Sequence, residues 1–177
     1  VRTEYFFRRV VIELTKDDVK HRDHHLLPEK EEIKVLADVK EQLERWYELD
    51  EFLPTPWFVP FTLPSKFCHE KVSDFDDIED IAIDMRKHWN LGLNPIPDLI
   101  DTFESKGIKV LTTKYDGHKK FNGLSAQVNG SPVVVLGSGE HWAGDRQRFT
   151  LAHELGHLVL EDLLDETLKK DEEYACH

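Results

Sequence analysis

The segment 144–160 combines apolar residues at helical spacing with three polar residues that are able to serve a metal ion: His153, Glu154 and His157. Histidines four positions apart leave a helix from one face, one turn apart, so both imidazoles can bind the same ion. The residues around them are apolar, and three polar side chains in a core would be costly without partners. The sequence therefore predicts a packed helix that carries a metal site.

The pattern His-Glu-x-x-His is typical of zinc sites that activate water. Zinc (Zn²⁺) binds two neutral imidazoles and a carboxylate, and it keeps one position for a water molecule whose acidity it raises. Glu154 lies about 100° around the helix from His153, outside the ligand set but near that water. We therefore expect Glu154 to be the base of a zinc peptidase, with His153 and His157 as metal ligands.

The third metal ligand has several candidates. Leu160 and Leu163 stand where a metzincin has glycine and histidine, which excludes that class. The downstream candidates are Glu161, Asp162, Asp165, Glu166, Glu172, Glu173 and His177. The candidates within the first eight residues after His157 are too close in sequence to fold back. Glu172 and Glu173 lie on a predicted helix that could pack beside the first, although a solvated helix face is an equal interpretation of both.

The order of the predicted elements places the chain in the α+β class. These elements are a strand at 5–14, a long amphipathic helix at 29–53, a proline-rich connector at 53–68, helices at 73–90 and 95–107, strands at 108–112, 123–128 and 132–136, and helices at 144–160 and from 166 onward. Asn129-Gly130 is a strong hairpin turn pair between the last two strands. We expect helices packed on a small antiparallel sheet of about three strands.

The prolines at 54, 56, 60 and 64 indicate the main boundary in the chain. We expect an N-terminal linker region at 1–70 and a peptidase domain at 71–177. The chain does not begin with Met and ends at His177 within a helical pattern, which indicates a fragment of a longer protein.

The charge balance and the cysteine count exclude several classes of protein. Asp and Glu total 35 against 23 for Lys and Arg, a net charge of -12 that repels a phosphate backbone. Two cysteines are too few for a disulfide framework and are typical of a reducing compartment. No apolar run approaches the roughly 20 residues that span a bilayer. We expect a cytoplasmic protein that binds neither nucleic acid nor membrane.

The motif block RQRFTLAHELGHL at 146–158, with EYACH at 173–177, resembles the ImmA/IrrE family of metallopeptidases. The resemblance extends back through NPIPDLI at 94–100 and FNGLSA at 121–126. It implies a zincin-like fold and a gluzincin-like zinc site completed by Glu173, because the family's glutamate stands three residues before the position of Cys176. His177 is not implied as a ligand. The family pattern continues past His177, so the peptidase domain at 71–177 is expected to be truncated at its C-terminus.

The resemblance also implies a function. Family members cleave or control regulatory proteins, so we expect a zinc-dependent endopeptidase that acts on a cytoplasmic regulator such as a repressor. Many members carry an N-terminal XRE-type helix-turn-helix domain that binds DNA, and none lies within this sequence. The main alternative is a non-enzymatic, metal-containing sensor or interaction module of a transcription regulator. A weaker one is a structural metal site closed by His177.

Other residues have two interpretations each. The strand at 123–128 could pair with an extended substrate, or it could simply complete the fold. Tyr115, His118, His141 and Tyr174 could each stabilise an oxyanion, but each is more typical of a surface residue. The histidine cluster at 21–25 is interpreted as a solvated loop.

Overall fold

The structure is a computed structural model of the 177-residue chain that describes residues 28–53, 59–69, 71–114, 123–138, 144–166, 168–171 and 175–176, with Ile12, Leu14 and Phe121. Its elements are α1 (Glu29–Glu51), η4 (Ser65–His69), α2 (Asp76–His88), α3 (Leu99–Ser105), β1 (Lys109–Lys114), β2 (Gly123–Val128), β3 (Ser131–Ser138), α4 (Gly144–Leu160) and η5 (Leu168–Asp171). The predicted α+β class and the three strands are confirmed. The strand predicted at 5–14 lies outside the described residues, apart from Ile12 and Leu14.

The sheet has the order β1-β3-β2, so β3 is the central strand. β2 and β3 form the predicted antiparallel hairpin, in which Gly123 pairs with Leu136 and Val128 pairs with Ser131. The turn residues Asn129 and Gly130 have φ angles of 49° and 76°. Asparagine and glycine adopt this left-handed conformation more readily than other residues, which explains why the hairpin forms at this point.

The direction of β1 corrects the expectation of a wholly antiparallel sheet. β1 runs parallel to β3, from the pair Lys109–Val133 to the pair Lys114–Ser138, so the sheet is mixed. The hairpin places β2 along one edge of β3, and β1 pairs with the other edge. A central strand is covered on both faces and reads as a continuous apolar run, as the sequence PVVVLG at 132–137 does.

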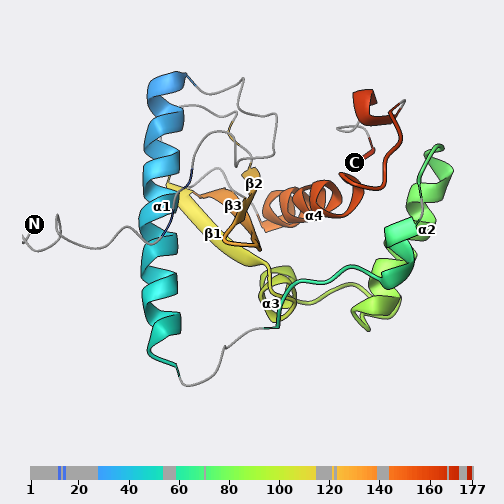
Figure 1. Ribbon diagram of the computed structural model, residues 1–177, viewed down its shortest axis with the longest axis horizontal. Helices are drawn as coiled ribbons and strands as arrows, with labels where there is room; N and C mark the ends of the chain where they lie inside the picture. Colours follow the sequence, from blue (N-terminus) through green and yellow to red (C-terminus); the bar gives the residue numbers. More distant parts are fainter. Residues whose placement is uncertain are drawn as a thin grey trace, which may run out of the picture.

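Each face of the sheet packs against different helices (Figure 1). Successive side chains of a strand point to opposite faces. Val133 and Val135 join the core under α1, whereas Val134 and Leu136 join the core under α3 and α4. The buried face of α1 consists of Val35, Val39 and Leu43. Figure 1 shows α2 at the far end of the molecule from α1, beyond α4.

A polar network joins α1 to β1. The carboxylate of Asp38 accepts hydrogen bonds from Thr113 Oγ1 at 2.7 Å and from Gln42 Nε2 at 3.0 Å. Gln42 Nε2 also lies 3.1 Å from the carbonyl oxygen of Thr112. These bonds fix α1 against the outer strand of the sheet. The helix of the predicted linker region thus packs on the sheet of the predicted peptidase domain, and the position of the domain boundary stays a prediction.

The buried cation of Lys109 also lies at this interface. Its ammonium group is 5.3 Å from the ring centre of Trp46 and 5.0 Å from that of Tyr47. Aromatic faces attract cations, which offsets part of the cost of burial. Burial lowers the pKa of Lys109, and Asp50 opposes this shift.

The starts of two helices differ from the prediction. α2 begins at Asp76 after Phe75, and Ser73 does not cap it; instead Asp74 Oδ1 accepts a hydrogen bond from the N–H of Asp76 at 3.2 Å. α3 begins at Leu99 instead of near Pro95. The side chain of Asp98 caps it by accepting a hydrogen bond from the N–H of Asp101 at 3.0 Å.

Two further segments also differ from the prediction. Of the helix expected from 166 onward, the described residues form the 3-10 helix η5 and Ala175 is α-helical, and η4 interrupts the proline-rich connector. The end of α2 agrees with the sequence: the helix stops at His88, and Asn90 and Gly92 follow with positive φ angles.

Backbone hydrogen bonds connect Val72, which precedes α2, to the turn after α4. The N–H of Val72 donates to the carbonyl of Leu163 at 2.8 Å, and the N–H of Asp165 donates to the carbonyl of Val72 at 3.0 Å. This bridge holds the two segments together at the end of α4. No helix within the described ranges combines the length and the apolar character needed to cross a membrane.

Asp38→Ala tests the network between α1 and β1. The substitution leaves the hydroxyl of Thr113, which is 2% exposed, without its acceptor. We expect the free energy of unfolding to fall by about 1–3 kcal/mol, measured by urea denaturation. Glu41→Ala is the control, because Glu41 pairs with Arg45 on the exposed side of the same helix, and it is expected to change the value by less than about 0.5 kcal/mol. Equal effects of the two substitutions would contradict the assignment.

Candidate metal centre

Helix α4 brings the predicted site residues together against the sheet. Leu151 and Leu158 anchor the helix in the core shared with α3. His153 is half-buried, His157 is 5% exposed and Glu154 is 1% exposed. The helical spacing read from the sequence therefore places all three residues on or beside the buried side of α4.

The two histidine rings converge. Their Nε2 atoms lie 3.2 Å apart, and the rings are 4.7 Å apart between centres with planes at 88°. Two nitrogens that each lie 2.0–2.1 Å from one tetrahedral zinc ion are separated by about 3.3 Å. The spacing and the donor type of this pair thus fit a zinc ion, with the Nε2 atom of each ring directed at the same point.

Phe149 covers one side of His153. The two rings are nearly parallel, at 14°, with centres 6.4 Å apart. Phe149 is itself 55% exposed, so it stands at the surface between solvent and the histidine. Phe149 is one turn before His153 on the helix, a spacing at which side chains contact one another. The aromatic ring therefore restricts the orientation of the imidazole, a role that we did not anticipate from the sequence.

Gly123 allows α4 to approach β2 closely. A Cβ atom at this position would lie 2.8 Å from Cγ2 of Thr150 and 3.0 Å from the carbonyl oxygen of Val135. It would also lie 3.3 Å from Oε1 of Glu154, so this carboxylate sits directly over the start of β2. Sequence reasoning missed this contact. A glycine within a strand often marks such an approach, and that signal could have identified it.

Gly156 allows a second close approach, near the C-terminal end of α4. A Cβ atom there would lie 3.0 Å from Cβ and 3.2 Å from Sγ of Cys176. The glycine between the two histidines therefore admits the segment that follows the predicted third ligand. Gly156 directly precedes His157, so Cys176 packs beside the turn of α4 that carries the two histidines.

Two of the described carboxylates after α4, Asp165 and Glu166, have contacts of their own. Asp165 Oδ1 accepts a hydrogen bond from the N–H of Leu168 at 3.0 Å and so caps η5, and Glu166 lies 3.5 Å from Lys169 Nζ. Among the residues whose positions are described, none adds a third donor to the histidine pair.

The other candidates lie outside the described residues. They are Glu172, Glu173, His177, Tyr115, His118, His141, Tyr174 and the histidine cluster at 21–25.

The arrangement of α4 defines a class of protein. Two converging histidines and a buried glutamate, on a helix packed against a small sheet, are typical of metallopeptidases with the His-Glu-x-x-His motif. Residues 103–176 match the family model described as the IrrE N-terminal-like domain, Peptidase_M78. The match supports the ImmA/IrrE family for this part of the chain, which runs from α3 through the sheet and α4. Comparisons with curated proteins and with solved structures found no match.

Gly123→Ala tests the close approach of α4 to β2. The added methyl group meets the Thr150 side chain and a fixed backbone oxygen, so α4 must shift away from the sheet. We expect the free energy of unfolding to fall by about 1–3 kcal/mol, measured by chemical denaturation. Adding Thr150→Ser, which shortens that side chain, is expected to restore part of the loss.

Gly144→Ala is the matched control for this substitution. Nothing lies within 4 Å of the position that its Cβ atom would occupy, at the first residue of α4. The control should be neutral or slightly stabilising, because alanine favours the helix more than glycine does. A Gly123→Ala variant as stable as Gly144→Ala would show that the contact between α4 and β2 is not tight.

Proposed function

We propose that this chain carries the site of a zinc-dependent endopeptidase in which His153 and His157 bind the ion, Glu173 is the third ligand and Glu154 is the general base. One observation above all supports the proposal: the two Nε2 atoms lie 3.2 Å apart, within the motif that the family match covers. Two neutral imidazoles and a carboxylate form a donor set that zinc prefers.

The position of Glu154 suits proton transfer in peptide hydrolysis. Zinc, when bound, supplies a Lewis acid that polarises the peptide carbonyl and increases the acidity of water. The Glu154 carboxylate accepts a proton from the attacking water, whose oxygen forms a bond to the carbonyl carbon. The carbon–nitrogen bond then breaks, and Glu154 donates the proton to the leaving nitrogen. Because Glu154 is 1% exposed beside Gly123, this proton is held away from bulk solvent.

The close approach at Gly156 supports the choice of Glu173 as the third ligand. Cys176 packs against Gly156, which directly precedes His157. Glu173 stands three residues before Cys176, and three residues of chain span at most about 11 Å. The family resemblance assigns the ligand to the same residue. The anchored Cys176 therefore limits how far from the histidines Glu173 can lie.

A cytoplasmic regulatory protein such as a repressor is the substrate that we propose, because the family resemblance implies this class. The surface of the chain supports a protein substrate over a nucleic acid, since its net charge is -12. Residues 1–70 are proposed as a region that links the peptidase domain to further segments of a regulator.

Metal analysis tests the ligands. The chain dialysed against zinc is expected to retain a single ion, and His153→Ala, His157→Ala or Glu173→Ala is expected to reduce zinc affinity at least about 10-fold. Zinc at about 100 times its dissociation constant should add about 2.7 kcal/mol to the stability of the unsubstituted chain. His88→Ala is the control, because His88 is an exposed histidine on α2. Undiminished zinc content in either α4 variant would rule out the proposed centre.

Glu154→Gln separates catalysis from metal binding. The amide preserves the shape of the side chain but cannot accept the proton, so we expect zinc to remain bound while cleavage slows by about 100-fold or more. A library of unstructured peptides, read by mass spectrometry, provides the assay. Glu166→Gln, at a carboxylate that is 92% exposed beside η5, should leave cleavage unchanged.

The same measurements distinguish the alternative function. A zinc-loaded chain that cleaves no peptide, at any enzyme concentration, would support a metal-containing sensor or interaction module instead. Cleavage by Glu154→Gln at the original rate would leave the metal site in place but remove Glu154 as its base.

A further inference from the structure

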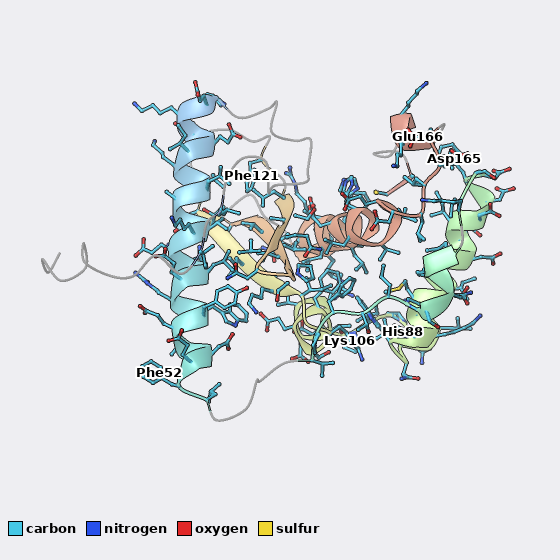
Figure 2. All side chains as sticks on the ribbon, viewed as in Figure 1. Phe52, His88, Lys106, Phe121, Asp165 and Glu166 are labelled. Atoms are coloured by element: carbon cyan, nitrogen blue, oxygen red, sulfur yellow. The ribbon has the colours of Figure 1, made fainter. Side chains whose placement is uncertain are left out.

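A groove of about 930 Å³ follows the outer edge of β1, away from α4. The continuous stretch 107–112 forms its floor, the second half of α1 forms one wall and α3 forms the other. In Figure 2, Phe52 marks the end of α1 and Lys106, next to the floor residue Gly107, marks the end of α3. A floor made of consecutive residues means that the strand presents its edge to the groove, since a strand face would contribute only alternate residues.

Hydrogen bonds establish which backbone groups of β1 point into the groove. The carbonyl of Thr113 faces β3, where Ser138 Oγ donates to it at 3.0 Å. The carbonyl of Thr112 faces away from β3, because Gln42 of α1 donates to it at 3.1 Å. Backbone groups alternate between the two sides of a strand in a parallel ladder. Val110 therefore directs its N–H and C=O outward, together with the N–H of Thr112.

The two ends of this outward row have partners within the chain. The N–H of Ile108 donates to the carbonyl of Phe103 at 3.1 Å, and Gln42 occupies the carbonyl of Thr112. Between these points, the described part of the chain supplies no partner to Val110 or to the N–H of Thr112. β1 pairs with β3 without a bulge, and neither proline nor a bulge protects this stretch of edge. Another extended backbone would satisfy these groups.

The walls of the groove define the side chains that such a backbone would carry. Trp46, Leu49 and Ile100 make the lining apolar, and Leu49 is 65% exposed. Asp101 and Glu104 give the α3 wall a negative charge, whereas the basic lining residues Arg45 and Lys109 lie on α1 and β1. No basic side chain in the described ranges pairs with either of them. Burial, followed by repulsion from Asp101 and Asp98, raises the pKa of Glu104.

We propose that the groove binds an extended peptide segment of a protein partner, which adds to β1 as a fourth strand and directs a lysine or arginine toward Asp101 and Glu104. Main-chain hydrogen bonds to Val110 and Thr112 hold the segment in register. Apolar side chains of the segment fill the space beside Trp46 and Leu49. This site is separate from the metal centre, because β3 lies between β1 and β2.

The test uses the whole chain and a nine-residue peptide of alternating lysine and valine, blocked at both ends. The peptide is expected to bind and to slow hydrogen exchange at the amides of Val110 and Thr112, measured by nuclear magnetic resonance. The amides of Leu111 and Thr113 face β3 and should be unaffected. A peptide in which glutamate replaces lysine should bind at least about 10-fold more weakly, because it meets the negative wall.

Matched variants test the strand edge and the charged wall independently. Thr112→Pro removes the outward N–H at an exposed edge position, where proline is compatible with a strand, and is expected to abolish binding. Thr112→Val keeps the N–H and should bind as the original chain does. Glu104→Gln should weaken binding of the lysine peptide about 3-fold and should not weaken binding of the glutamate peptide. Circular dichroism and urea denaturation confirm that each variant is folded.

Several results would overturn the proposal. These are no binding of the lysine peptide at about 1 mM, equal binding of the glutamate peptide, equal binding by folded Thr112→Pro, or protection on the edge of β2 in place of β1. None of them depends on zinc or on Glu154, so failure here leaves the proposed peptidase function standing.

Discussion

The contact between α4 and the start of β2 is the constraint on which the site depends. Glu154 is a carboxylate that lies almost entirely inside the protein, and it fits there because Gly123 has no side chain. Burial of a carboxylate is costly unless hydrogen-bond donors or a cation pair with it. The same packing directs the side chains one position before and three positions after Glu154, which are the two histidines. The distance between helix and sheet therefore determines the geometry of the whole centre.

Features that depend on neighbours in the sequence were predictable. Apolar spacing predicted α1 and α4 to within a residue or two at each end, and Asn129-Gly130 predicted the hairpin of β2 and β3. The pairing of His153 with His157 follows from helix geometry alone, since residues four apart share a face. Each of these predictions needs only the local conformation, which a short stretch of sequence encodes.

Features that depend on distant contacts were not predictable. The direction of β1 relative to β3 depends on how the chain before and after it is packed, and no residue of β1 encodes that choice. The late start of α3 reflects Arg148 of α4, which binds the carbonyls of Ile96 and Pro97 and so holds the preceding residues out of the helix. The roles of Gly123 and Gly156 likewise require the partner segments to be placed first.

The two edge strands of the sheet have different neighbours. β2 contacts the helix of the metal centre, whereas β1 lies between α1 and α3 and has its outer backbone groups directed into the groove. β3 is central and buried along its length, so a strand added to β1 would extend the sheet without touching Gly123 or Glu154. The network of Asp38, Gln42 and Thr113 holds α1, which forms one wall of the groove, against β1. The sheet can therefore hold the proposed partner at one edge while the opposite edge positions α4.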